Sequence, residues 1–163
     1  MKTNDKLIEQ IGRAFPEQVF DARRAFDDFG KMYPDAAAYL EQIDGKTWRT
    51  VDAPWLVKRS DALGFLGTRW LVAAMPVYLI AAVRDGVWSP ATEMLVLILT
   101  RPGVGSDSGL GHKRFAALVD ALTSEQRTVV GGVLHHIAKI DPEGSLGLAA
   151  VAALEGCWNG YVP

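Results

Sequence analysis

Cysteine is nearly absent from this 163-residue sequence: Cys157 is the only one, so no disulfide can form within the chain. Disulfides are common in secreted proteins and rare in the reducing cytosol. The opening segment, MKTNDKLIEQIGRAF, is polar and lacks the apolar stretch of a secretory signal peptide. We therefore expect a cytoplasmic protein.

A strong charge of either sign is also missing. The chain has 17 basic and 19 acidic side chains, which gives a formal net charge of −2. Nucleic-acid-binding proteins gather lysine and arginine on one face. Short pairs such as Arg23-Arg24 and Lys58-Arg59 are instead typical of solvated helix surfaces. We therefore expect no nucleic-acid partner.

No uninterrupted apolar run is long enough to span a bilayer. The longest, from Trp70 to Val83, has 14 residues, whereas a spanning helix needs roughly 17–25. Extending the run back to Leu63 brings Arg69 into it. We therefore expect no membrane partner, and we interpret this stretch as a buried helix of a soluble protein.

The segment from Leu63 to Arg84 is the best candidate for the centre of the fold. It is apolar on all sides, which is typical of a helix that is buried all round. Pro76 lies inside it, and a proline there removes one backbone hydrogen bond and clashes with the carbonyl of Val72. We predict a kinked, broken central helix that is wrapped by amphipathic neighbours.

Helix-start signals recur along the rest of the chain. They are the possible N-caps Asn4, Asp52 and Thr68, the Ser89-Pro90 pair, and the capping-box pattern of Thr123 and Gln126. Together with the spacing of apolar residues, they predict an all-α fold. We expect one compact domain over residues 1–163, with six to eight helices around a Pro-kinked central helix.

Two segments have some character of β-strands. The segment TWRTV, which contains Trp48, is predicted to be a short extended piece. The segment MLVLILT is apolar enough to be a buried strand, and periodicity alone does not distinguish this from a helix. The preceding Ser89-Pro90 pair and the early position of Glu93 favour a helix.

A glycine-rich loop, Gly103 to Gly111, follows an apolar run and precedes a predicted helix, which is the order found in phosphate-binding loops. Such a loop ends in Gly-Lys-Ser/Thr, because the lysine reaches the phosphates and the hydroxyl reaches magnesium. Here the end reads Gly111-His112-Lys113-Arg114 and supplies no hydroxyl. We interpret the segment as a mobile surface loop and predict no nucleotide cofactor.

The histidines and the cysteine are not arranged as a reactive or metal-binding group. His135 and His136 are adjacent, so on a helix they point about 100° apart and do not share a metal ion. We expect one to be partly buried and the other exposed, with His112 remote in sequence. Cys157 is near the C-terminal end of a predicted helix, whereas a reactive thiol is favoured by a helix N-terminus or a nearby histidine. We predict that Cys157 packs, and we assign no catalytic residue, metal or cofactor.

Tryptophan is abundant, with five in the chain. Trp48 and Trp88 fall in predicted connections, where a partly exposed indole can anchor a partner protein. A second possibility is a pocket at the Pro76 kink, formed with Trp70 and Tyr78. The tyrosine would supply a polar tip in an apolar wall there.

The central residues resemble a bacterial family of small helical proteins of unknown function. The resemblance lies in Phe65-Leu66 and in Met75-Pro76-Val77-Tyr78-Leu79. Further landmarks are Phe15-Pro16, Trp48, Leu122-Thr123, Glu125-Gln126, Ala153-Leu154 and Trp158. The chain departs from the family pattern at Gly67-Thr68, where the family tends to have Ser/Thr-Pro, and at Ala73-Ala74, which replace aromatic residues. The resemblance implies a helical fold and supplies no catalytic residues.

These observations favour a protein-binding module. Its concrete form would be a bacterial immunity protein that neutralises a toxin by occluding it. The alternatives are a small-ligand-binding helical protein with a pocket near Pro76, and an enzyme whose site the sequence does not reveal. The sequence leaves the oligomeric state open.

Overall fold

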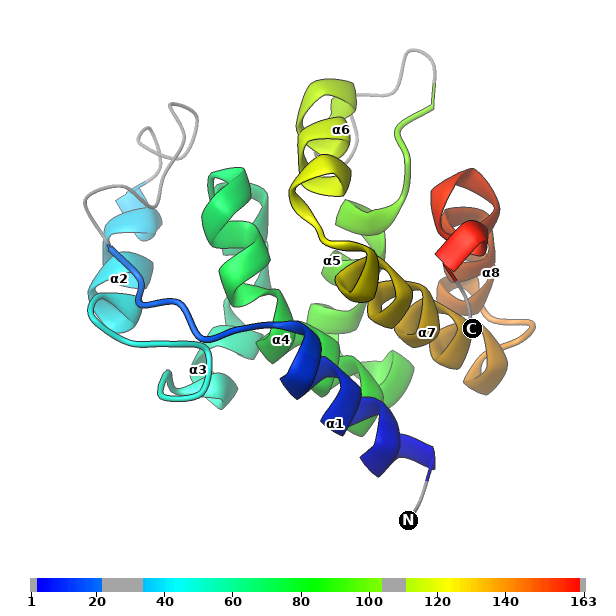
Figure 1. Ribbon diagram of the computed structural model, residues 1–163, viewed down its shortest axis with the longest axis horizontal. Coiled ribbons are helices and arrows are strands. Elements are labelled where there is room, and N and C mark those ends of the chain that lie inside the picture. Colours follow the sequence, from blue (N-terminus) through cyan, green and yellow to red (C-terminus); the bar gives the residue numbers. More distant parts are fainter. Residues whose placement is uncertain (1–2, 22–33, 104–110, 162–163) are drawn as a thin grey trace.

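The computed structural model describes residues 3–21, 34–103 and 111–161, and these form helices and no strand. The predicted helix surface at Arg23-Arg24 and most of the predicted loop from Gly103 to Gly111 lie outside these residues. The described part contains eight α-helices, and 77% of the structure is helical (Figure 1). The all-α prediction is therefore confirmed.

Eight α-helices follow one another along the described residues. They are α1 (Thr3–Ala14), α2 (Pro34–Ile43), α3 (Ala53–Lys58), α4 (Thr68–Asp85), α5 (Pro90–Leu99), α6 (Gly111–Ala121), α7 (Ser124–Ile140) and α8 (Ser145–Ala153). Two short 3₁₀ turns flank α4, and they are η3 (Ser60–Gly64) and η4 (Gly86–Trp88). Helix α8 is followed by a π-turn, η5 (Leu154–Trp158), and then by a last 3₁₀ turn, η6 (Asn159–Tyr161).

Helix α4 is the centre of the fold, as the apolar run predicts. It contacts α1, α3, α5, α6 and α7, and most of its residues are buried (Figure 1). The predicted break at Pro76 does not occur, because α4 is one continuous helix from Thr68 to Asp85. Proline removes one helical hydrogen bond there, while the packing of neighbouring helices around most of α4 favours the helical path.

The stretch Thr68–Trp88, with 21 residues, is long and apolar enough to cross a membrane by length and composition. However, 67% of its most apolar window is buried inside the protein. The described residues contain no second helix of this kind. A buried apolar helix is what a soluble protein needs at its centre, so α4 is explained by core packing.

Several predicted helix starts are present in the structure. The Asp52 carboxylate accepts a hydrogen bond from the Trp55 backbone N–H at 3.1 Å, and the Ser89 hydroxyl accepts one from Ala91 at 3.3 Å. Thr123 and Gln126 form both hydrogen bonds of a capping box, at 3.2 and 2.9 Å. These signals are correct because a cap depends on residues only a few positions apart.

Three local predictions are wrong. Asn4 lies inside α1 and does not cap it; its side-chain amide donates to the Val83 carbonyl of α4 at 3.2 Å. Thr68 is the first residue of α4, and Gly67 occupies the N-cap position. The segment around Trp48 is a turn and not an extended piece, because the Thr50 N–H bonds back to the Thr47 carbonyl at 3.0 Å.

Candidate binding surfaces

None of the three grooves and depressions described below is lined by Trp70, Pro76 or Tyr78, the residues of the pocket predicted at the Pro76 kink. Trp70, Pro76 and Tyr78 are all buried in the core. The Trp70 indole packs against Phe20, with ring centroids 5.8 Å apart. These three residues pack in the core, and a ligand pocket among them stays a prediction.

The polar tip of Tyr78 is satisfied inside the core. Its hydroxyl donates to the Leu56 carbonyl at 3.2 Å and lies 3.1 Å from the hydroxyl of Tyr39. Because a carbonyl can only accept, the single Tyr78 proton goes to Leu56, and Tyr39 is the donor to Tyr78. Burial raises the pKa of Tyr39 to about 12 and holds the pKa of Tyr78 well above its usual 10. Both tyrosines therefore stay neutral and structural.

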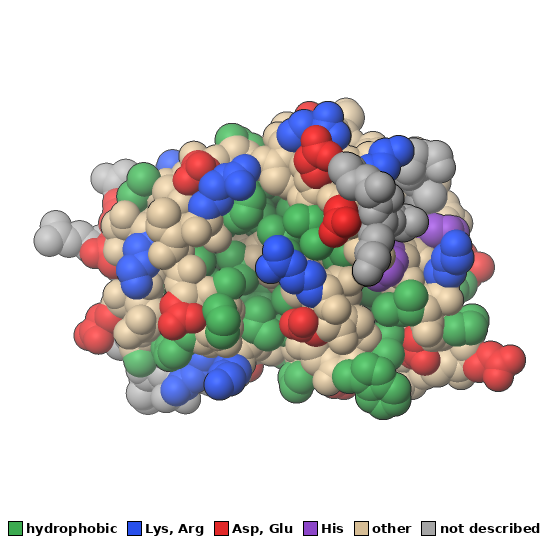
Figure 2. All heavy atoms as spheres, turned by 90° about the horizontal axis from the view of Figure 1, so that it is seen from below, with side chains coloured by type: hydrophobic (Ala, Val, Ile, Leu, Met, Phe, Trp, Pro, Cys, Tyr) green, Lys and Arg blue, Asp and Glu red, His purple; other side chains and the backbone are tan. Residues whose placement is uncertain are grey.

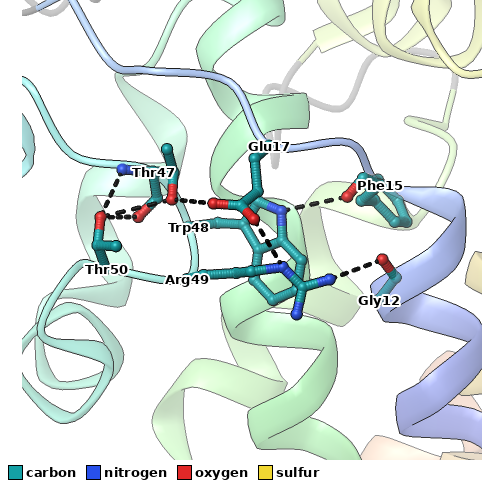
Figure 3. Close-up of polar contacts among 7 residues, drawn as sticks. All are labelled: Gly12, Phe15, Glu17, Thr47, Trp48, Arg49 and Thr50. Atoms are coloured by element: carbon teal, nitrogen blue, oxygen red, sulfur yellow. Dashed lines mark hydrogen bonds and ion pairs between the residues drawn. The ribbon is translucent and has the colours of Figure 1, made fainter.

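Trp48 is also buried, with 7% of the residue exposed, so the prediction that it is an exposed partner anchor is wrong. Its indole N–H donates to the Phe15 carbonyl at the end of α1, at 3.2 Å (Figure 3). The physical reason is the turn at residues 47–51, which folds against α1 and turns the indole inward. The Arg49 guanidinium then covers the ring at 4.1 Å from its centroid.

Arg49 is held by contacts from three directions (Figure 3). Its Nε atom pairs with Glu17 at 3.1 Å, and one terminal N–H group donates to the Gly12 carbonyl at 3.0 Å. The other carboxylate oxygen of Glu17 accepts from the Thr47 hydroxyl at 2.8 Å. This arrangement fixes the guanidinium plane, because ion pairing, hydrogen bonding and stacking on Trp48 all act on it.

Beside Arg49 lies a groove of about 520 Å³ between α1, the 47–51 turn and α4, which we call the arginine groove. It is lined by Ile8, Glu9, Gly12, Arg13, Trp48, Arg49, Ala53, Val77, Ile80 and Arg84. Its apolar side chains come mainly from α1 and α4, and three arginines stand against a single glutamate. The view from below shows hydrophobic side chains in a hollow with basic side chains beside them (Figure 2).

Trp88 lies on the η4 turn and, unlike Trp48, is exposed to solvent, with 91% of the residue accessible. Its neighbour Val87 lines a second groove of about 410 Å³ between α5 and α8. Leu97 of α5 and Leu146 and Ala149 of α8 line the same groove. We call Trp88 and these four residues the Trp88 surface. The prediction of an exposed indole is confirmed at this position.

Helix α8 adds to the apolar character of this part of the molecule. Its sequence, SLGLAAVAA, contains no charged residue. Leu148 and Val151 are 57% and 38% exposed, on the side of α8 away from the core. Single exposed apolar residues are ordinary. Here two of them lie on one uncharged helix, and other residues of that helix line the groove that Val87 also lines, which is typical of an interaction surface.

A third depression, of about 380 Å³, brings together polar side chains that are far apart in sequence. Arg101, His112, Asp120 and Cys157 line it. Burial raises the pKa of the Cys157 thiol, and Arg101 and Arg127 only partly oppose this effect. A protonated thiol is a poor nucleophile, so the interpretation of Cys157 as a packing residue agrees with its surroundings.

The paired histidines of α7 differ in exposure, as predicted. His135 is exposed, and His136 is partly buried against the end of α4. Burial and the nearby Lys139 lower the pKa of His136, while a hydrogen bond with the Val83 carbonyl raises it. Across residues 3–21, 34–103 and 111–161, no three histidine, cysteine or acidic side chains come close enough to hold a metal ion.

The arginine groove was missed by sequence reasoning. Arg13, Arg49 and Arg84 lie on separate elements, and no motif or spacing connects them. The adjacency of Trp48 and Arg49 was the only local signal, because arginine commonly stacks on tryptophan.

Searches against family models, curated proteins and solved structures found no match to this chain. The resemblance to a bacterial helical family therefore stays a prediction.

Proposed function

We propose that this chain is a cytoplasmic protein-binding module that engages its partner through the Trp88 surface. The observation that carries the proposal is the 91% exposure of Trp88 beside an apolar groove. Tryptophan is enriched among the residues that contribute most to protein–protein binding, because its large ring loses much water contact when it is covered.

The surroundings of Trp88 support this choice. The groove beside it is lined mainly by aliphatic side chains, with Glu93 as its one charged residue. An interface of this kind has an apolar centre and a polar rim, and α8 supplies further uncharged surface nearby. A bacterial immunity protein, which occludes a toxin by covering it, is the specific form that we propose for this module.

The test is affinity capture of binding partners with three matched proteins: the unchanged chain, Trp88→Ala and Lys113→Ala. Lys113 is exposed on α6 and lies outside the Trp88 surface, so it controls for a general surface change. We expect a partner that binds the unchanged chain and Lys113→Ala but is lost with Trp88→Ala. Equal capture by all three proteins would contradict the proposal.

The immunity role has its own test. Co-expression of the chain with a toxin encoded beside its gene should restore growth, and Trp88→Ala should abolish that protection. Protection that is unchanged in Trp88→Ala would place the contact elsewhere on the molecule.

A further inference from the structure

We propose that the arginine groove binds a small amphipathic carboxylate, a ligand with one carboxylate group on an apolar body. The apolar body would lie along Ile8, Val77 and Ile80, and the carboxylate would face the arginines. This site is separate from the Trp88 surface, and the inference does not depend on the proposed function.

The charged side chains that line the arginine groove favour a negatively charged ligand. Arg13, Arg49 and Arg84 line the groove with Glu9, although the whole chain has a net charge of −2. Glu17 pairs with Arg49 at 3.1 Å, so the positive charge that is left comes mainly from Arg13 and Arg84. Arg13 pairs with Glu9 only at 3.9 Å, and both side chains are more than half exposed, so this pair is weak. No hydrogen bond or ion pair joins Arg84 to any other described residue. The guanidinium groups of Arg13 and Arg84 are therefore little used by the protein and are available to a ligand carboxylate.

Arg49 is already in place for such a ligand. Its contacts with Trp48, Gly12 and Glu17 use part of the guanidinium and leave other N–H donors available. A fixed guanidinium loses less conformational entropy on binding than a free one.

The size and the remaining lining narrow the class of ligand. The volume of about 520 Å³ falls within the roughly 300–1,000 Å³ of small-molecule sites. The aliphatic side chains require an apolar body, which excludes a simple inorganic anion. Glu9 repels a second negative charge, which favours a monoanionic carboxylate over a dianionic phosphate ester.

The experiment is an NMR titration of the full chain with decanoate, and with decanol as the uncharged probe of the same length. We expect decanoate to give saturable shifts of the Gly12 and Arg49 backbone amides and to bind about tenfold more tightly than decanol. Arg84→Gln should remove most of that difference, whereas Lys113→Gln should keep it. Trp88→Ala should leave the decanoate affinity unchanged, so that the two proposals fail independently.

Two results would overturn the inference. Equal binding of decanol and decanoate would show that the arginines do not recognise the carboxylate. Shifts of the same amides by a glutamate-rich peptide, with none by decanoate, would show that the groove receives an acidic protein segment. Neither result requires a variant to fold, because both are measured on the unchanged chain.

Discussion

Trp158 and Trp88 show how differently one residue type is used in two regions of this molecule. Trp158 lies in the η5 turn and is completely buried, whereas Trp88 lies in the η4 turn and is 91% exposed. The Trp158 indole N–H donates to the Leu99 carbonyl at 2.7 Å, and the ring packs edge-on against Phe115. Trp158 therefore closes the core, and Trp88 is available for contact with another molecule.

The difference arises from what surrounds each turn. Leu99 is the last residue of α5, and carbonyls at a helix C-terminus lack a partner within the helix. Trp158 supplies that partner, because η5 packs against α7 and α8 and brings the indole to this point. Trp88 lies in the connection between α4 and α5, and its side chain points to solvent.

The largest expected effect comes from Trp158→Ala. Removal of this buried ring leaves a cavity and an unpaired Leu99 carbonyl, so we expect a loss of about 3–5 kcal/mol in the free energy of unfolding. Urea denaturation followed by circular dichroism measures it. Trp158→Phe is the matched control and should lose less, because it keeps part of the ring volume. A loss below about 1 kcal/mol for the alanine variant would contradict the comparison.

The buried tyrosines provide a second test of the interior. Tyr78→Phe removes two hydrogen bonds: the one that the Tyr78 hydroxyl donates to the Leu56 carbonyl and the one that it accepts from the Tyr39 hydroxyl. Tyr39→Phe removes only the hydrogen bond between the two hydroxyls. We expect the free energy of unfolding to fall by about 2 kcal/mol in Tyr78→Phe and by about 1 kcal/mol in Tyr39→Phe. Urea denaturation of both variants and the double variant checks the order. The reverse order would show that the donor assignment is wrong.

The capping box of α7 should contribute less than the buried side chains. Thr123→Ala removes the side-chain acceptor for the Gln126 N–H, so we expect a loss of about 1 kcal/mol in the free energy of unfolding. Ser124→Ala is a suitable control, because Ser124 follows the cap and is exposed. Thermal unfolding of both variants measures the difference. If both variants unfold at the same temperature, the cap has no special role.

His136 should make stability depend weakly on acidic pH. Its pKa is lower in the folded protein than the usual 6.5, so the unfolded chain binds more protons between these two values. Stability should therefore fall as the pH decreases below about 6.5. Urea denaturation across this range should show a smaller slope of stability against pH for His136→Gln than for the unchanged chain. An unchanged slope in His136→Gln would assign the effect to other groups.

The smallest expected effect on stability is that of Trp88→Phe. An exposed side chain contributes little to folding, so we expect a change within about 0.5 kcal/mol in the free energy of unfolding. Acrylamide should quench the fluorescence of the unchanged chain more strongly than that of the variant, because Trp88 is exposed and Trp158 is buried. A large loss of stability would show that Trp88 packs in solution.

The residues that were predicted correctly are those whose structure depends on near neighbours. Asp52, Ser89 and Thr123 cap helices through atoms two or three residues away, so short patterns were enough. Asn4 has the same chemistry, yet its amide bonds to Val83 across the interface of α1 with α4. A local pattern does not contain that long-range partner.

The candidate binding residues also depend on long-range packing that the sequence pattern does not contain. Trp48 and Trp88 both lie in connections between helices. Trp48 is buried and is covered by the Arg49 guanidinium, whereas Trp88 is exposed. Pro76 is buried in the core, whereas Val77 and Ile80 on the same helix line the arginine groove. The composition of α4 does not show which of its sides is covered by α1, α5 or α7.

The sequence by itself determined the helical class, the apolar central helix and the starts of α3, α5 and α7, because these follow from periodicity and from contacts within a few residues. Only the tertiary structure decided that Trp88 is exposed, that Trp48 is covered, and that three arginines from separate elements share one groove. These outcomes depend on which helix faces pack together, and that packing joins residues distant in the chain.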